Sequence, residues 1–306
     1  EHPADGFPSL RLANLMHLGH NMSVDLYVEN VIADAKLVVL RLLGGQGYWP
    51  YGCDQVAQVC AANKIPVAFL PGDDQPDAEL ADLSTLDADA QHRLWQYLVH
   101  GGPENALDFV NYAADLIGYD CEWQEPRPLV RAGLHWPGAA NTDLARVQSN
   151  WVEGRPVAAL VFYRALVQSG NLWAVEAVIE GLATAGLNPL PVFVASLKDP
   201  IAAATLETLL ADAPPAVIIN ATGFAVSAPG QDRTRGPFDC GGDDGGPVVL
   251  QMVFSGGNEE DWRTGTRGLG ARDISMNVAL PEVDGRVMSR AVSFKGSVRR
   301  DPLTET

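Results

Sequence analysis

The sequence lacks the short motifs of several large enzyme classes. It contains no G-x-x-x-x-G-K-[ST] loop, no G-x-S-x-G elbow and no H-E-x-x-H pair, and no G-x-G-x-x-G follows its first predicted strand. These absences leave nucleotide hydrolysis, serine or zinc hydrolysis and nicotinamide binding without support from the residues. We therefore expect the chain neither to bind nor to hydrolyse ATP.

Basic residues, cysteines and long apolar runs are also scarce. Lys and Arg number 21 against 38 Asp and Glu, and the net charge of −17 argues against a nucleic-acid partner, because phosphates need a basic surface. The four cysteines form no C-x-x-C pair, which excludes a zinc ribbon or redox motif and favours free thiols in the cytoplasm. No apolar run approaches the roughly 18 residues of a membrane span.

What the sequence does contain is an alternation of apolar runs and helical spacing, which restarts near residue 156. The 306 residues are enough for roughly two domains. Strands that are apolar on both faces, separated by single helices, indicate parallel sheets covered on both sides. The pattern predicts an α/β fold of two Rossmann-like or flavodoxin-like units with mainly parallel sheets. We assign them to 1–120 and 156–306, joined by a Pro-, Gly- and Trp-rich connecting segment, 121–155.

The predicted strands lie at 10–16, 36–43, 66–70, 156–163, 190–195, 216–220, 248–254 and, as an edge strand, 286–294. The predicted helices lie at 24–35, 54–63, 87–99, 104–117, 171–185, 200–211 and 259–264. The Gly- and Asp-rich stretch 229–246 is typical of a mobile loop. The chain begins at Glu1 and ends in a turn-like stretch, so we expect a piece of a longer protein or a processed chain.

Polar and aromatic side chains gather directly after the predicted strands. In open parallel sheets, ligands bind outside the carboxyl ends of the strands. We therefore predict a ligand-binding face, which consists of His17, His20, Asn21, Tyr48, Trp49, Tyr51, Arg164, Asn171, Asn220 and Thr222.

Each of these features also has a plainer structural interpretation. His17 and His20 could ligate a divalent metal or simply pack in a loop, and without a visible third ligand we expect no bound metal. The aromatic string around Trp49 could stack on a flat macrocycle or form a packed turn. Arg164 could meet a ligand carboxylate or form a structural ion pair, and Asn220 could line a ligand or only shape a turn.

Several long strings resemble the CobN-type large subunits of aerobic cobaltochelatase, in the family that also contains the magnesium-chelatase H subunit. The matching strings are HLGHNMSVDLY (17–27), LLGG (42–45), YWPYG (48–52), FLPGDD (69–74), YLVHGGPEN (97–105), FYRA (162–165), SLKD (196–199), NATGFA (220–225) and ALPEVDG (279–285). The resemblance covers nearly the whole chain and concerns only the N-terminal portion of the family's much longer subunit.

The resemblance implies a metal chelatase that inserts Co²⁺, as substrate, into hydrogenobyrinic acid a,c-diamide in cobalamin biosynthesis. It implies a chain that binds the corrinoid, holds no cofactor of its own and works in the cytoplasm with AAA+ motor subunits of the CobS and CobT type, which hydrolyse ATP. The catalytic residues are unknown and are expected outside this portion, which alone is expected to be inactive. Two alternatives remain: a non-catalytic two-lobed binding module, and a magnesium-chelatase H subunit acting on protoporphyrin IX.

Overall fold

The computed structural model describes residues 7–139, 142–227, 236–239, 246–266 and 268–296, and the chain divides into two α/β units. The first unit comprises Glu1–Leu129 with Val298–Thr306, and the second comprises Val130–Ser297. The predicted α/β class with largely parallel sheets is confirmed. Within the described residues, no helix is both long and apolar enough to cross a membrane.

The first unit is built around a two-stranded parallel sheet of β1 and β2. Its elements are η1 (Leu15–Leu18), α1 (Asn21–Asn30), η2 (Ile32–Asp34), β1 (Val38–Leu42), η3 (Gln46–Tyr48), α2 (Pro50–Asn63), β2 (Val67–Pro71), α3 (Ala78–Leu83), α4 (Ala88–His100) and α5 (Pro103–Asp115). Side chains alternate along a strand. Val67 and Phe69 of β2 therefore pack with α1 and α2, whereas Ala68 and Leu70 pack with α4 and α5.

The predicted strand at 10–16 is wrong. Residues 10–14 have no regular secondary structure, and η1 follows them because the Asn14 side chain accepts a hydrogen bond from Met16 N and starts a tight turn. Leu10, Leu12 and Met16 are exposed, so this apolar run does not supply a third strand to the sheet.

The second unit contains a six-stranded sheet. Its elements are β3 (Ala132–Leu134), α6 (Leu144–Gln148), β4 (Val157–Tyr163), α7 (Arg164–Ser169), α8 (Trp173–Thr184), β5 (Asn188–Val194), α9 (Pro200–Asp212), β6 (Val217–Asn220), β7 (Val248–Phe254), α10 (Glu259–Thr264), α11 (Ala271–Ile274), the π-helical η4 (Ser275–Ala279), α12 (Leu280–Val283) and β8 (Val287–Ser293).

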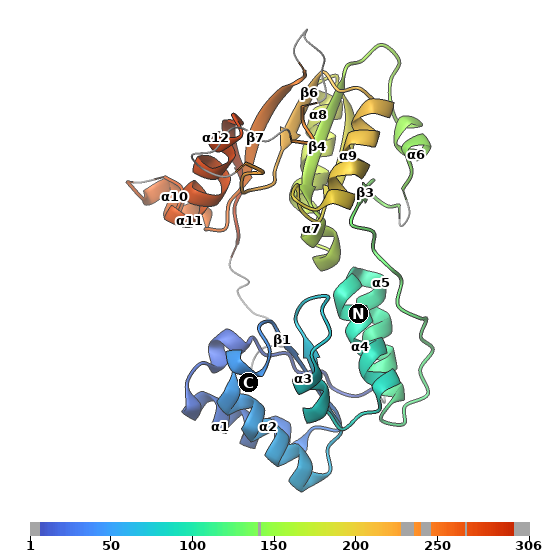
Figure 1. Ribbon diagram of the computed structural model, residues 1–306, viewed down its shortest axis with the longest axis vertical. Coiled ribbons are helices and arrows are strands. Elements are labelled where there is room, and N and C mark those ends of the chain that lie inside the picture. Colours follow the sequence, from blue (N-terminus) through green and yellow to red (C-terminus); the bar gives the residue numbers. More distant parts are fainter. Residues whose placement is uncertain (1–6, 140–141, 228–235, 240–245, 267, 297–306) are drawn as a thin grey trace. The chain divides into compact units, whose positions relative to one another are not determined.

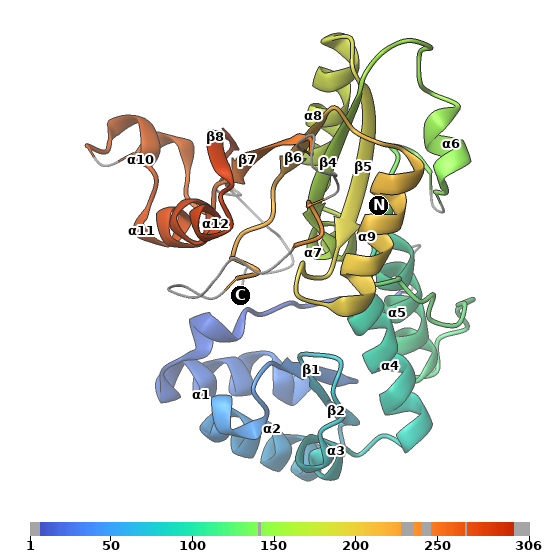
Figure 2. The same ribbon diagram turned by 45° about the horizontal axis from the view of Figure 1, so that its top comes forward.

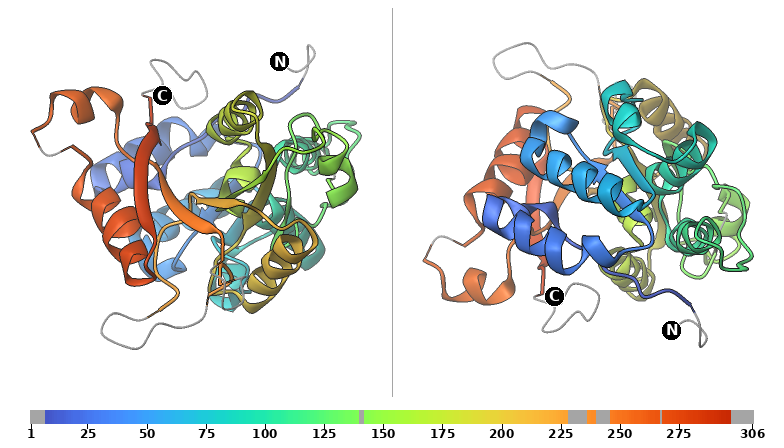
Figure 3. Two further views of the ribbon diagram at one scale, coloured as in Figure 1. Left: turned by 90° about the horizontal axis from the view of Figure 1, so that it is seen from above. Right: turned by 90° about the horizontal axis from the view of Figure 1, so that it is seen from below.

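The strand order in this sheet is β3-β5-β4-β6-β7-β8, and all pairs are parallel except β3 with β5. The five parallel strands thus follow the flavodoxin-like order 2-1-3-4-5. Helices α8 and α9 cover opposite faces, as the left view of Figure 3 shows. Ala159 and Val161 of β4 pack in one core with Leu206 and Leu210 of α9, and β8 lies at the sheet edge, as predicted.

The residues of the predicted connecting segment 121–155 are divided between the two units. Residues 122–127 pack on α4 and α5, where Arg93 pairs with Glu125 at 2.9 Å and its guanidinium lies 5.0 Å from the Trp123 ring. Residues 132–134 form β3 and 144–148 form α6, both in the second unit. This segment therefore contributes to both cores, and the predicted loop 229–246 lies largely outside the described residues.

Free thiols are found at Cys53, Cys60 and Cys121, whereas Cys240 lies outside the described residues. Cys53 and Cys60 are on α2 and are part of the first core. Burial raises the pKa of both thiols to about 11, so both are protonated and unreactive at neutral pH.

Candidate functional site

The sheet of the second unit has a topological switch point between β4 and β6. From β4 the chain passes through α7 and α8 to β5 on one side, and from β5 it returns through α9 to β6 on the other side. Ligands of open parallel sheets bind at the carboxyl ends of the strands at such a point. The loops at this edge are the start of α7, visible at the end of β4 in Figure 2, and the residues 221–227 after β6.

A buried hydrogen-bond network forms the floor of this edge. The Asn220 Nδ2 donates to Gln251 Oε1 at 2.8 Å and to Thr222 O at 3.0 Å, and Thr222 Oγ1 donates to Asn220 Oδ1 at 2.8 Å. Gln251 Nε2 donates to Thr222 O at 2.8 Å. All three side chains are fully buried. The hydrogen bonds of Asn220 and Thr222 are therefore made within the protein, where they fix the conformation of the loop.

Phe224 has an unusual backbone conformation above this floor. Its φ is 62°, in the left-handed region that a bulky side chain rarely adopts. Its N–H donates to Met276 O at 2.9 Å. Close packing requires a glycine at the preceding position, because a Cβ on Gly223 would lie 2.8 Å from Met276 O. Tyr163 at the end of β4 donates from its hydroxyl to Gly223 O at 3.1 Å.

A buried ion pair holds the other side of the same loop. Arg286 Nη2 donates to Phe224 O and pairs with Asp284 Oδ2 at 2.9 Å. The Asp284 carboxylate also accepts from the backbone N–H groups of Val226 and Ser227, at 2.7 and 2.9 Å. Burial opposes ionisation of Asp284, but these N–H donors and the guanidinium outweigh it and lower its pKa below the ordinary value. The charged carboxylate is thus an anchor for the loop.

The predicted histidine pair lies in the first unit, on the surface. His17 is in η1, His20 directly precedes α1, and both are exposed, as is Asn21 at the first position of α1. Among the described residues there is no group of three His, Cys, Asp or Glu side chains that could hold a metal ion. The pair offers two nitrogen ligands to solvent and no closed coordination shell.

The predicted aromatic string, also in the first unit, is split between core and surface. Trp49 is 8% exposed, packs in the core with Leu18 and donates from Nε1 to Leu18 O at 2.9 Å. A Cβ at Gly52 would lie 2.1 Å from the Trp49 ring, so this glycine is required by the packed indole. Tyr48 is exposed, and Tyr51 donates from its hydroxyl to Asp25 at 2.6 Å, which ties α2 to α1. Trp49 is therefore not available for stacking on a ligand in this structure.

Arg164 and Asn171 flank α7 at the carboxyl end of β4. Arg164 is the first residue of α7, is partly exposed and donates from Nε to Val130 O at 2.9 Å. Asn171 is exposed, and its backbone N–H closes the end of the helix on Leu166 O. Of the predicted residues, three thus lie at the switch point: Arg164 begins α7, Asn220 ends β6 and Thr222 follows β6. Of these three, Arg164 is the one with a side chain at the surface.

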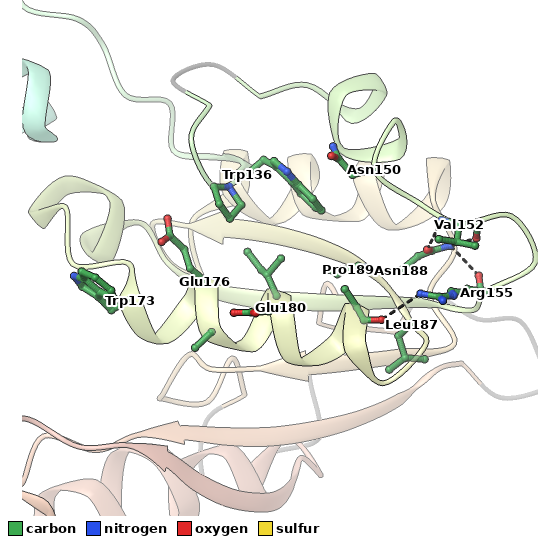
Figure 4. Close-up of a pocket in the computed structure, with 14 residues that line it drawn as sticks. Trp136, Asn150, Val152, Arg155, Trp173, Glu176, Glu180, Leu187, Asn188 and Pro189 are labelled. Carbon is green, nitrogen blue, oxygen red and sulfur yellow. Dashed lines mark hydrogen bonds between the residues drawn. The ribbon is translucent and has the colours of Figure 1, made fainter.

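A cavity of about 530 Å³ lies along α8 in the second unit, as Figure 4 shows. Trp136 and Trp173 lie toward one end, Asn188 and Leu187 toward the other, and Glu176 and Glu180 point from the helix. A second cavity of about 370 Å³ is lined by Val226 of the 221–227 loop, by Asp284 and by Arg286, among other residues. None of the ten predicted residues is among the described residues that line either cavity.

His135 lies next to the cavity along α8. Its Nε2 is 3.4 Å from Glu176 Oε1, a long contact, and its ring meets Phe162 edge-on at 6.3 Å. Burial lowers the pKa of His135 below the ordinary histidine value, and the Glu176 carboxylate partly opposes this effect. His135 is therefore a partly buried, neutral imidazole at neutral pH.

The sequence pattern predicted neither the backbone conformation of Phe224 nor the part that Asp284 and Arg286 play at the switch point. Nothing in the string NATGFA (220–225) signals a left-handed conformation at Phe224, because such a conformation is expected of Gly, Asn or Asp. Asp284 and Arg286 are about 60 residues further along the chain, and only the fold brings them to this loop. The signal that was available was position, since NATGFA directly follows a predicted strand.

The chain is similar to proteins of a known family. The family model described as CobN/Magnesium Chelatase matches residues 95–306. The chain is 46% identical over 310 residues to the aerobic cobaltochelatase subunit CobN of a Sinorhizobium species, covering 98% of this chain and 24% of that protein. It is 44% identical over 303 residues to the same subunit of Pseudomonas aeruginosa, covering 99% of this chain and 24% of that protein.

A solved structure is similar as well. The catalytic subunit of cobaltochelatase from Mycobacterium tuberculosis matches with a TM-score of 0.65 and 27% sequence identity, over 90% of this chain and 22% of that chain. The chain therefore spans about a quarter of the length of these relatives. Because the family model matches well over half of the residues, the resemblance of the sequence strings is confirmed, and the chain belongs to the CobN/magnesium-chelatase family.

Proposed function

We propose that this chain is an N-terminal portion of the tetrapyrrole-binding large subunit of an aerobic cobaltochelatase. The observation that carries the proposal is the 46% identity to a cobaltochelatase subunit over 98% of the chain. The second relative, at 44% identity, is also a cobaltochelatase subunit, which favours cobalt over magnesium as the inserted metal. The proposed ring substrate is hydrogenobyrinic acid a,c-diamide, and the proposed reaction is insertion of Co²⁺ in cobalamin biosynthesis in the cytoplasm.

The switch-point edge of the second unit is the proposed contact surface of this chain for the ring. A corrinoid is flat and apolar on its faces, with carboxylates and amides around its rim. The edge offers an exposed aromatic ring at Phe224 and a cationic group at Arg164. The buried Asn220 network and the Asp284–Arg286 pair hold the 221–227 loop in one conformation, so little conformational entropy is lost when a ligand binds.

Insertion of the metal requires a base and a source of ATP hydrolysis, and we assign neither of them to this chain. Two ring N–H protons must leave and water must be removed from Co²⁺, which requires a base and a site that excludes solvent. We assign the base to the remainder of the subunit. The sequence has no phosphate-binding loop, so we assign ATP hydrolysis to AAA+ partner subunits of the CobS and CobT type, whose motions would close the site.

The test is reconstitution with the full native protein that contains this chain. Purified protein, the two motor subunits, ATP, Co²⁺ and hydrogenobyrinic acid a,c-diamide are mixed, and insertion is followed by the absorbance change of the ring. We expect insertion that requires ATP and the motor subunits, and no insertion by the 306-residue chain alone. A parallel reaction with Mg²⁺ and protoporphyrin IX should give no product.

Two outcomes would overturn the proposal. Turnover only with Mg²⁺ and protoporphyrin IX would assign the protein to the magnesium branch of the family. Tight binding of a ligand or partner, without insertion of either metal under any of these conditions, would instead favour a non-catalytic two-lobed binding module.

A further inference from the structure

We infer that Phe224 is an aromatic platform on which one face of the tetrapyrrole ring stacks. This inference rests on the proposed function and deepens it, because it names a residue of the ring-binding surface. Its basis is that Phe224 combines a strained backbone, a rigid support and an exposed ring at the switch point of the sheet.

The strain at Phe224 is imposed from both sides of the residue. Its N–H donates to Met276 O at 2.9 Å, and its carbonyl accepts from Arg286. Arg286 is itself buried and paired with Asp284, whose carboxylate also holds the N–H of Val226. A left-handed conformation in a non-glycine residue persists only where the surroundings over-determine it, and such residues cluster at ligand sites.

The strain does not serve to bury the side chain. Phe224 is 51% exposed, whereas Ala221, Thr222, Gly223 and Ala225 on either side of it are buried. A loop that only needed to fold would place a glycine or asparagine at a φ of 62° and would not present half of an aromatic ring to water. The backbone conformation therefore positions the ring outward rather than into the core.

A flat ligand fits this arrangement better than a protein partner does. A protein interface needs a contiguous core of apolar and aromatic side chains, and the residues next to Phe224 in the loop are buried. A single aromatic ring on a rigid support suits offset stacking on a flat conjugated ring, in the way that aromatic side chains stack on nucleic-acid bases.

The binding test uses the full native protein and hydrogenobyrinic acid a,c-diamide, titrated by quenching of tryptophan fluorescence. Phe224→Tyr keeps the flat ring and should keep the affinity within about twofold. Phe224→Leu keeps an apolar side chain without an aromatic face and should weaken binding about tenfold, as loss of one stacking contact does. Phe224→Ala and Phe224→Gly should weaken binding to at least the same extent.

Thermal unfolding separates the backbone from the ring. Both Phe224→Ala and Phe224→Gly remove the ring, but glycine also relieves the left-handed strain, so the Gly variant should unfold about 2–4 °C higher than the Ala variant. Lys64 provides a matched control, because it has a φ of 55° at the end of α2 in the first unit. Lys64→Gly should likewise exceed Lys64→Ala in stability, and neither should change corrinoid affinity.

The failures of the two proposals are distinguishable. Wild-type protein that does not bind the corrinoid would overturn the proposed function. Wild-type protein that binds, with unchanged affinity in the Leu, Ala and Gly variants, would overturn only the role of Phe224. The same holds if Phe224→Leu lowers stability or subunit assembly and leaves affinity intact, because the ring would then be packed against protein.

Discussion

The two units each place an aromatic residue in a loop after a parallel strand, and they use it in opposite ways. In the first unit, Trp49 follows β1, turns inward and donates its indole N–H to Leu18 O. In the second unit, Phe224 follows β6 and remains half exposed on a backbone that is fixed at both of its peptide groups. One side chain completes a core, and the other is presented at a surface.

The size of the two sheets explains this difference. A two-stranded sheet is marginally stable and depends on the side chains of its helices and loops to form a core. The core of the six-stranded sheet in the second unit comes mainly from its strands and helices, and Val226 is the residue of the 221–227 loop that packs against it, while a polar network forms the floor of the loop. A loop that adds little to a core can present a side chain to a ligand, whereas a loop on a small sheet is needed for folding.

The largest expected effect concerns Trp49. Trp49→Ala should destabilise the first unit by about 3–5 kcal/mol, because it removes a large buried ring and leaves a cavity. Thermal or urea unfolding of the chain measures this loss. The matched control is Trp173→Ala on α8, since Trp173 is 84% exposed and its removal should change stability by less than about 0.5 kcal/mol. Equal effects of the two substitutions would contradict the assignment of Trp49 to the core.

A smaller effect is expected from Asn220 in the second unit. Asn220→Ala should cost about 2–4 kcal/mol, because it leaves buried polar groups of Thr222 and Gln251 without their partners. Denaturant unfolding measures the cost, and Asn171→Ala, at an exposed position, serves as the control. If Asn220→Ala left stability unchanged but abolished corrinoid binding, Asn220 would be a ligand-contacting residue, as the sequence first suggested.

The smallest expected effect is the pH dependence due to His135. Histidine has an ordinary pKa of about 6.5, and burial lowers the pKa of His135 in the folded state. The unfolded chain therefore takes up the proton first as the pH falls, so this residue makes stability decline from about pH 6.5 downward. His135→Gln should remove this part of the decline in melting temperature between pH 7.5 and 5.5.

Glu176 gives an internal check on the sign of this prediction. Its carboxylate opposes the effect of burial, so Glu176→Gln should lower the pKa of His135 further and make the decline of stability with falling pH steeper. A decline that becomes shallower in Glu176→Gln, or that is unchanged in His135→Gln, would show that another group is responsible.

The sequence predicted much of the fold where local patterns and burial agree. The continuous apolar runs at 156–163 and 248–254 became β4 and β7 within one residue, because a strand buried on both faces has few other ways to satisfy its side chains. The apolar run at 10–16 failed as a strand, because Leu10, Leu12 and Met16 remain exposed and Asn14 starts a tight turn. The segment 132–134 was missed because a three-residue edge strand carries too little pattern.

The candidate site was predictable in position but not in its side chains. The string at 220–225 follows a buried strand, and that placed the loop at the carboxyl edge of a parallel sheet. The sequence could not distinguish the buried Asn220 and Thr222 from the exposed Phe224, since all three residue types occur in binding loops. Exposure depends on contacts with residues 276–286, which are distant in the chain.

By itself, the sequence determined the α/β class, the family and the loops in which a site would lie, because strand and helix periodicity and long matching strings are local properties of the chain. Only the tertiary structure decided which side chains face solvent. The inward position of Trp49 depends on the backbone of Leu18, and the outward position of Phe224 depends on Met276 and Arg286. Such hydrogen bonds join residues 31 to 62 positions apart in the chain, so no local pattern encodes them.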